Sequence, residues 1–227
     1  MRLSGPAVTR GAVGRVKVAG TGRAADRSGA ELQEHILRCV VKLVGVRGFE
    51  KVRLRDVAAE AGVSVGSLQH YFDTRSTLMQ RAFAYQGERV IAELESAAQT
   101  GASPWQRIEA LVSYATVTDG FRDRCTVWLE FSAASARDPG LRSVMERVYE
   151  GWRAPLRDAI EQGVQQGVFS PAMPTEQVVD MILTLIDGFE LATAGRIRGF
   201  NGKRAHDVVL ATTASVVGLP ATTSTGA

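Results

Sequence analysis

Only two cysteines occur among the 227 residues, Cys39 and Cys125, and they form no CxxC pair. Both lie in segments with helical apolar periodicity, so we expect reduced, packed thiols rather than a disulfide or a metal site. No run approaches the roughly 18 apolar residues of a membrane helix, and the N-terminus has no continuous apolar segment typical of a secretory signal. These absences predict a cytoplasmic protein that holds no metal and has no membrane partner.

Signatures of catalysis are also missing. The sequence contains no HExxH, no GxSxG, no phosphate-binding loop and no Gly-rich dinucleotide fingerprint. Its three histidines, His35, His70 and His206, are scattered along the chain. We therefore expect no enzymatic activity and no cofactor.

Acidic residues are scarce at the N-terminus, where residues 1–28 hold six Lys and Arg residues and one acid, Asp26. The sequence pI of about 9.1 therefore reflects this segment rather than the body of the protein. Because it is rich in Gly, Ala and Thr and has no period, we predict a disordered basic arm. It is either a leader without a binding role or an arm that adds phosphate contacts. Residues 220–227 are predicted to be a disordered tail.

Strand pairs, hairpins and internal repeats are not evident, whereas helical periodicity fills most of the chain. Ser103–Pro104 and Asp138–Pro139 are typical helix starts, because Ser or Asp caps a helix and Pro fits its first turn. The pattern predicts an all-α protein of about nine helices. A helix-turn-helix unit at residues 29–75 is followed by a larger helical bundle at residues 76–219.

A short helix pair is predicted within residues 54–72. Gly62 ends the first helix, since glycine adopts the left-handed conformation at the lowest cost. Ser64 is placed to cap the second helix by accepting from the backbone N–H of Gly66 or Ser67.

The second helix of this pair has one apolar and one polar side. On a helical wheel, Val65, Leu68 and Phe72 fall on the buried side. The opposite side presents a bare backbone at Gly66, an imidazole, a hydroxyl and an amide. Such a short polar helix suits the major groove, where Gln matches the adenine edge.

The stretch RLRDVAAEAGVSVGSLQHYFDTRSTLM resembles the DNA-binding domain of TetR-family transcriptional regulators. The match spans residues 31–82 and has Ala58, Gly62, Leu68 and Tyr71–Phe72 at the family's spacing. The resemblance implies that the second helix enters the major groove of a double-stranded operator. The residues that we predict to bind DNA are Arg53, Ser64, Val65, Gly66, Ser67, Gln69, His70, Tyr71 and Arg75.

Two of these residues depart from the family pattern. Arg53 stands where the family usually has Thr or Ser, so it cannot cap the helix and either weakens its start or contacts phosphate instead. Gln69 replaces a Tyr that is common there. By the same resemblance, Tyr71 and Arg75 contact phosphates.

The stretches RCTVWLEFSAASARDPGLRSVMERVYEGWRAPL and VVDMILTLIDGFELATAG resemble the C-terminal domain class shared with the choline-responsive repressor. The resemblance implies that the last two long helices, at about 175–197 and 204–217, form a four-helix homodimer interface. A dimer would present two recognition helices about 34–36 Å apart to a palindromic operator.

The middle helices are then expected to enclose a pocket for a small-molecule effector. Its candidate lining residues, each of which can also be a plain core residue, are Tyr85, Trp105, Tyr114, Trp128, Phe131, Tyr149, Trp152 and Phe189. Glu130 lies within an apolar run and either pairs with an Arg or meets a cationic ligand.

These features together predict a homodimeric, nucleoid-associated repressor that a small molecule releases from its operator. The alternative is an activator, or a DNA-binding regulator without a ligand, with the same fold.

Overall fold

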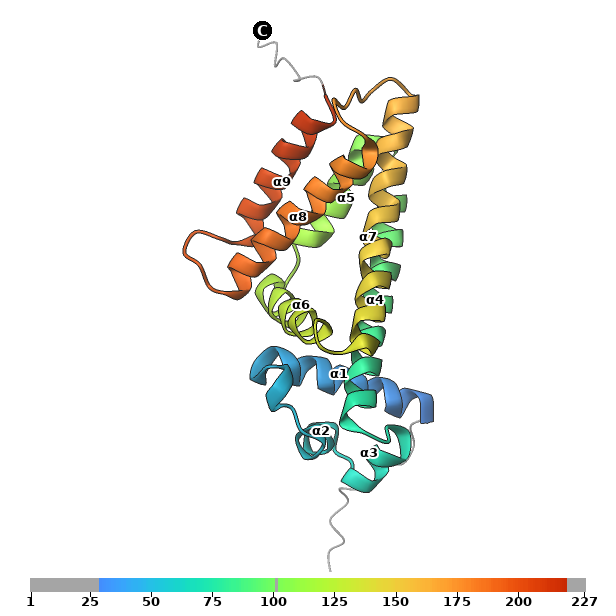
Figure 1. The fold of residues 1–227 in the computed structure, drawn as a ribbon, viewed down its shortest axis with the longest axis vertical. Helices are drawn as coiled ribbons and strands as arrows, with labels where there is room; N and C mark the ends of the chain where they lie inside the picture. Colours follow the sequence, from blue (N-terminus) through green and yellow to red (C-terminus); the bar gives the residue numbers. More distant parts are fainter. Residues whose placement is uncertain (1–28, 101, 220–227) are drawn as a thin grey trace, which may run out of the picture.

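A computed structural model describes residues 29–100 and 102–219 (Figure 1). Within these ranges the chain forms nine α-helices, one 3-10 turn and no strand. The elements are α1 Gly29–Arg47, η1 Phe49–Lys51, α2 Leu54–Ala61, α3 Val65–Tyr71, α4 Arg75–Gln99, α5 Pro104–Thr116, α6 Phe121–Ser135, α7 Pro139–Gln165, α8 Thr175–Ala194 and α9 Gly202–Val216. The prediction of an all-α protein is confirmed. The predicted basic arm and C-terminal tail lie outside the described residues.

Local capping chemistry explains where most helices begin. The side chains of Ser64, Thr74, Ser103, Asp138 and Asn201 each accept a hydrogen bond from a backbone N–H in the first turn that follows. The helix starts expected at Ser103–Pro104 and Asp138–Pro139 are therefore present. Thr175 is the first residue of α8 and not its cap, because Pro174 precedes it at the capping position.

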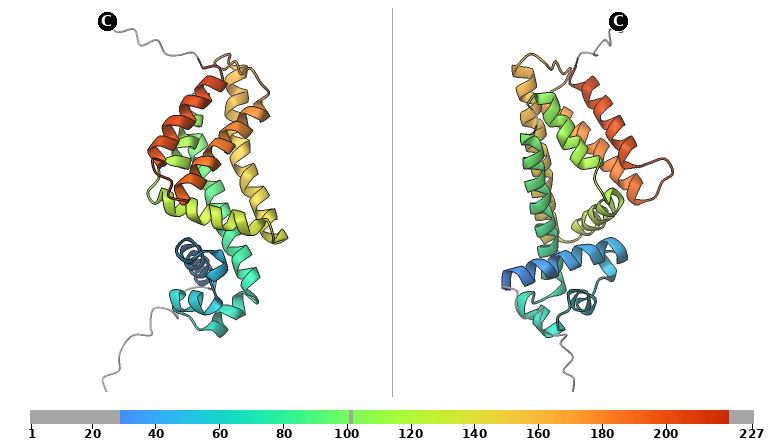
Figure 2. Two further views of the ribbon diagram at one scale, coloured as in Figure 1. Left: turned by 60° about the vertical axis from the view of Figure 1, so that its left-hand side comes forward. Right: turned by 180° about the vertical axis from the view of Figure 1, so that it is seen from behind.

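The molecule is elongated, with α1, α2 and α3 at one end and α5, α8 and α9 toward the other (Figures 1 and 2). The long helix α4 leaves the first end and runs beside α7 along the body. Glycines permit their close approach, since a Cβ on Gly87 would lie 2.6 Å from Val148 Cγ2 and one on Gly151 would lie 2.5 Å from Ile91 Cγ1. The end that holds the helix pair is thus joined to the body by a tightly packed helix.

Two hydrophobic cores fill the described part of the chain. One combines the buried side chains of α1, α2 and α3 with Phe83 of α4, Phe131 of α6 and Leu141 of α7. The other lies among α5, α7, α8 and α9 and the far end of α4. The boundary predicted at residue 75 coincides with the start of α4, and the first core continues across it.

The sequence argued against a disulfide, a membrane helix and a metal site, and the described residues can be checked for each. Cys39 and Cys125 are both buried, and neither forms a disulfide. No helix in the described ranges is long and apolar enough to cross a membrane. Among the same residues, no group of three or more His, Cys, Asp and Glu side chains is placed to hold a metal ion.

Candidate nucleic-acid interface and ligand cavity

The helix α3 has one buried and one exposed side. Leu68 and the following Phe72 are fully buried, whereas Gly66, Ser67, Gln69 and His70 are exposed. Val65 was expected on the buried side, and this is wrong, because it is the first residue of the helix and is 39% exposed. The exposed set therefore includes a small apolar side chain beside the polar ones.

The turn before α3 has the predicted geometry. Gly62 is left-handed, with φ 69° and ψ 31°, and Val63 N–H donates to Ala58 O at 3.0 Å. Ser64 Oγ accepts from the backbone N–H of Ser67 at 2.9 Å and lies 2.8 Å from Ser67 Oγ. The capped helix is held rigidly against α2, which keeps its exposed side in a fixed orientation.

Arg53 precedes α2 and has an exposed side chain. Its guanidinium has no acceptor atom, so it cannot cap the helix. The carboxylate of Asp56 compensates in part, since Oδ2 accepts from the backbone N–H of Arg53 at 3.1 Å. Asp56 is held in turn by Arg47 at 2.8 Å. The side chain of Arg53 remains available to a partner molecule.

Arg75 has structural partners that the sequence did not indicate. Its Nε donates to Val52 O at 2.7 Å, a second guanidinium nitrogen donates to Phe49 O, and its Cζ lies 5.1 Å from the centre of the Phe49 ring. These contacts give Arg75 a structural role and use two of the five N–H donors of its guanidinium, so the predicted phosphate contact stays a prediction. Tyr71 is only partly exposed and packs on the first core.

Arg75→Ala is expected to lower the free energy of unfolding by about 2 kcal/mol, because it removes charge-assisted hydrogen bonds that are partly buried. Urea unfolding of the variant and of Arg122→Ala, an exposed arginine on α6, measures the difference. If stability is unchanged and the salt dependence of DNA binding becomes flatter, the phosphate contact is the main role of Arg75.

Phe49 joins the helix pair to the body of the protein. Its backbone N–H donates to Glu130 Oε2 on α6 at 2.7 Å, and its carbonyl accepts from Arg75. Its ring meets that of Phe131 edge to face, with 5.7 Å between centres. Contrary to one expectation, Glu130 forms no ion pair with an arginine of the described residues, and it does not line the cavity described next. These contacts fix α6 to the segment between α1 and α2.

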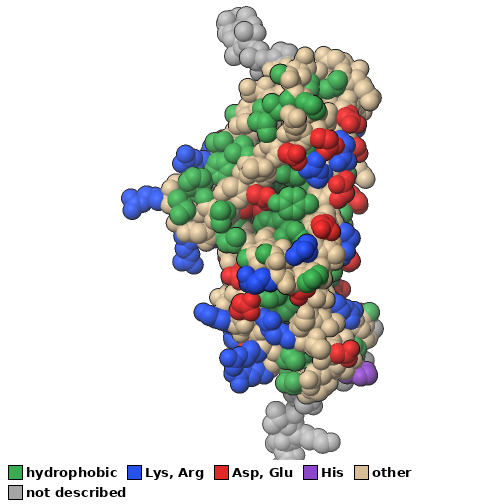
Figure 3. Space-filling model, viewed as in Figure 1, with side chains coloured by type: hydrophobic (Ala, Val, Ile, Leu, Met, Phe, Trp, Pro, Cys, Tyr) green, Lys and Arg blue, Asp and Glu red, His purple; other side chains and the backbone are tan. Residues whose placement is uncertain are grey.

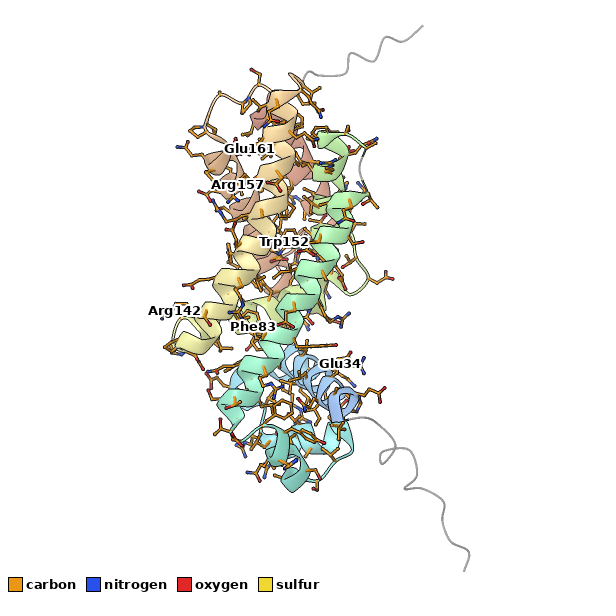
Figure 4. All side chains as sticks on the ribbon, turned by 90° about the vertical axis from the view of Figure 1, so that its right-hand side faces the viewer. Glu34, Phe83, Arg142, Trp152, Arg157 and Glu161 are labelled. Carbon is orange, nitrogen blue, oxygen red and sulfur yellow. The ribbon has the colours of Figure 1, made fainter. Side chains whose placement is uncertain are left out.

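A cavity adjoins this junction, among α4, α6, α7 and α8, with Tyr114 of α5 also on its wall. It encloses about 720 Å³ including its open side. Its aromatic lining is Phe83, Tyr114, Trp128, Phe131, Tyr149 and Trp152. Figure 3 shows acidic side chains among hydrophobic ones near the middle of the face that is turned to the viewer. Figure 4 shows Phe83 and Trp152 on the adjacent helices α4 and α7.

Five of the eight aromatic residues proposed from the sequence line this cavity, and three do not. Tyr85 faces α1, where its hydroxyl donates to Glu34 at 3.0 Å. Trp105 packs against the second core from the start of α5. Phe189 is buried on Phe200, with 5.4 Å between ring centres. A helix turns aromatic residues in all directions, so their identity alone did not select those that face the cavity.

Two acidic residues of α8 face the same cavity, and the sequence analysis did not single them out. Asp187 accepts hydrogen bonds from the hydroxyl of Tyr149 and, at 3.4 Å, from Trp128 Nε1. Glu190 follows one turn later and makes no hydrogen bond with any described residue. Acids three residues apart in the apolar stretch MILTLIDGFELATA were the signal that could have revealed them.

Burial governs the ionisation of these two acids. It raises the pKa of Asp187, although the hydrogen bonds from Tyr149 and Trp128 favour the charged form. Burial also raises the pKa of Glu190 to about 8, with the Asp187 charge adding to the rise and Arg124 opposing it. Near neutral pH, Glu190 is therefore largely protonated as long as no cationic ligand is bound beside it.

Arg124 of α6 is the cation nearest to these acids on the cavity wall. It donates to the carbonyl oxygen of Tyr114 at 2.9 Å and to that of Ala115. Its Cζ lies 5.1 Å from the centre of the Tyr114 ring. Because the guanidinium is bonded to the end of α5, it does not form an ion pair with Glu190.

The comparisons with known proteins agree with this architecture. Residues 36–82 match the family model described as bacterial regulatory proteins of the tetR family. Residues 104–218 match the model for the C-terminal part of the BetI-type transcriptional repressor.

The relatives that we compared are transcriptional regulators. The repressor KstR of Mycobacterium tuberculosis is 27% identical over 159 residues, which cover 70% of this chain and 65% of that protein. A transcriptional regulator from Saccharomonospora viridis, solved in complex with choline, has a TM-score of 0.76 at 24% identity, covering 82% of this chain and 96% of that one. FadR of Bacillus subtilis, solved in complex with stearoyl-CoA, has a TM-score of 0.68 at 18% identity, covering 82% and 98%. With both halves of the fold matched, the chain belongs to the TetR family of transcriptional regulators and has a C-terminal domain of the BetI type.

Proposed function

We propose that this regulator is a homodimeric repressor that dissociates from a palindromic operator when a small organic cation binds in its cavity. The observation that carries this proposal is the pair of acids, Asp187 and Glu190, within an aromatic lining. Aromatic faces attract cations, most strongly where water is excluded, and a carboxylate adds a full opposite charge.

The ligands of the solved relatives differ in chemistry, so the fold alone does not select an effector. One relative was solved with choline and another with stearoyl-CoA. A fatty acyl chain would cover the carboxyl group of Glu190 without giving it a partner, at a cost in free energy. A quaternary ammonium such as that of choline satisfies both the aromatic rings and the acids. This contrast favours the cation.

DNA binding is assigned to the exposed side of α3 and its surroundings. Val65, Gly66, Ser67, Gln69 and His70 would face bases and nearby phosphates. Ser64 and Tyr71 at the two ends of the helix, and Arg53 before α2, would contact the backbone. Figure 3 shows further Lys and Arg side chains over the same end of the molecule, which suits a polyanion.

The dimer would form through α8 and α9. Met181, Leu191 and Val208 on these helices, together with Ile197 just after α8, are large apolar side chains that are 36–58% exposed. Hydrophobic side chains are frequent over this part of the surface in Figure 3. Such a patch on α9 and on α8, which also lines the cavity, suits an interface with a second copy.

Effector binding would reach the DNA-binding end through α6 and α4. Phe83 and Phe131 line the cavity and stack with 4.5 Å between ring centres, and Phe131 also contacts Phe49. A cation between these helices would favour a different placement of Phe49 and of the α4 start that Arg75 holds. A ligand releases the operator only to the extent that it binds the two states unequally.

The test uses the full chain and an operator selected by this protein from a random-sequence DNA pool. Light scattering should give twice the chain mass of 24.4 kDa. Choline, titrated into the protein–DNA complex, should release the DNA and lower the fluorescence anisotropy of the labelled operator. A monomeric mass would contradict the dimer. If choline binds the protein but leaves operator binding unchanged at every concentration, the activator or the ligand-independent alternative is favoured.

A further inference from the structure

A second hollow adjoins the cavity, between α1, α4 and α6, and encloses about 940 Å³ including its open side. Figure 2 shows these three helices converging at the junction of the DNA-binding end and the body. Gln86, Arg124 and Val127 line both hollows, so the two lie side by side with these three side chains between them. We call the second one the outer hollow.

The outer hollow has the opposite charge to the cavity. Arg38 and Lys42 of α1, Arg89 of α4 and Arg124 line it together with a single carboxylate, that of Asp123. The cavity next to it contains Asp187 and Glu190. The two neighbouring hollows therefore place acids in the inner one and bases in the outer one.

The bases of the outer hollow are free to exchange partners. Arg38 pairs with Glu34 at 3.3 Å, Lys42 with Glu60 at 2.6 Å, and Arg89 with Glu93 at 3.6 Å. The side chains of these three bases are 51–68% exposed. Exposed ion pairs of this kind contribute little, so an incoming anion can replace the glutamates at low cost.

From this juxtaposition we propose that the effector is a small zwitterion, whose ammonium group occupies the aromatic cavity and whose carboxylate or phosphate group lies in the outer hollow. A ligand with only a positive charge has no group for the bases of the outer hollow. A ligand with only a negative charge has none for the acids of the cavity. A zwitterion of suitable length matches both ends.

The position of the anionic group has a regulatory consequence. Arg38 and Lys42 lie on α1, within the DNA-binding end, whereas Arg89 and Arg124 lie on the helices that enclose the cavity. An anion held by both sets would bridge the two parts directly. The effector would then act on α1 as well as through Phe49. This inference rests on the proposed cation cavity and extends it.

The experiment compares choline with phosphocholine, which carries the same trimethylammonium group and adds a phosphate. Binding to the full chain is measured by calorimetry and by tryptophan fluorescence, since two of the three tryptophans, Trp128 and Trp152, line the cavity. We expect phosphocholine to bind at least fivefold more tightly than choline. The triple variant Arg38→Gln, Lys42→Gln, Arg89→Gln should remove this advantage and leave choline affinity unchanged. Arg142→Gln, an exposed arginine on α7 outside both hollows, is the control.

The outcomes separate this inference from the proposed function. Choline binding without any advantage for phosphocholine, or an advantage that survives the triple variant, would overturn the zwitterion and keep the cation cavity. Failure of both compounds to bind would remove the cation cavity and the zwitterion together. Inorganic phosphate alone binding as tightly as phosphocholine would reduce the outer hollow to a simple anion site.

Discussion

Gly66→Glu is expected to reduce operator affinity by at least 100-fold while the folded dimer is retained. A Cβ at this position would meet only Ser64 Oγ, at 3.8 Å, so the fold has room for a side chain. The added carboxylate would point at the phosphates and base edges of the groove. Like charges forced together at an interface cost several kcal/mol, and about 1.4 kcal/mol corresponds to a tenfold change in affinity.

Two variants separate the effect of position from that of charge. Gln99→Glu adds the same charge at the far end of α4, on an exposed residue, and should leave affinity almost unchanged. Gly66→Ala adds a methyl group without a charge and should cost much less than the glutamate. Anisotropy of a labelled operator measures affinity, and circular dichroism checks the fold. Near-normal operator binding by Gly66→Glu would show that α3 does not enter the groove.

Local features of the helix pair could be predicted because they depend on neighbouring residues. The left-handed Gly62 and the cap at Ser64 follow from chain geometry within a few residues, and both are present. The wheel failed at Val65, since it treats every residue as part of a full helix that packs on the core. The first residue of α3 has no preceding turn to bring it onto that core.

Contacts between residues far apart in the chain could not be predicted from the sequence pattern. Arg75 binds carbonyl oxygens that lie 23 and 26 residues earlier, and Glu130 binds a backbone N–H that lies 81 residues earlier. Neither partner has a side-chain signature, because any residue supplies a carbonyl or an N–H. Backbone acceptors and donors of this kind are visible only once the helices are packed.

The aromatic residues of the sequence predicted only part of the cavity lining. Trp128, Tyr149 and Trp152 were identified because large rings in middle helices commonly line pockets. Asp187 and Glu190 were not, although an acid in a strongly apolar helix carries a desolvation cost that requires an explanation. Their role depends on α6 and α7 facing α8, which no local pattern specifies.

Glu190 should make effector binding depend strongly on pH. Burial, and to a lesser extent the Asp187 charge, raise its pKa to about 8 from an ordinary value near 4.5, so the free protein holds a proton there at neutral pH. A bound cation favours the ionised carboxylate, so binding below pH 8 requires the release of that proton. Choline affinity should therefore rise by up to about tenfold per pH unit between pH 6 and pH 8, and level off above.

The raised pKa of Glu190 also makes the free energy of unfolding depend on pH. The pKa of Glu190 is higher in the folded than in the unfolded protein, so the stability it contributes is fully present below about pH 4.5 and is lost as pH rises through about 8. Glu190→Gln has no proton to release. It should therefore be more stable than the parent at pH 8, with a smaller dependence of unfolding free energy on pH.

Calorimetric titration of choline at pH 6, 7, 8 and 9 tests this assignment against its neighbours. The titratable and charged groups around Glu190 are Asp187 on α8, Arg124 and Cys125 on α6, and Tyr149 on α7. Burial raises the pKa of the Cys125 thiol to about 12, and burial likewise raises the pKa of Tyr149, so neither titrates in this range.

Glu190→Gln should flatten the pH profile and weaken choline binding at pH 9 by about tenfold or more. Asp187→Asn should weaken binding at pH 9 and move the plateau of the profile to lower pH, because the Asp187 charge no longer raises the pKa of Glu190. A slope that persists in Glu190→Gln would assign the proton to another group, and a flat profile in the parent would mean that the cation does not lie beside this carboxylate.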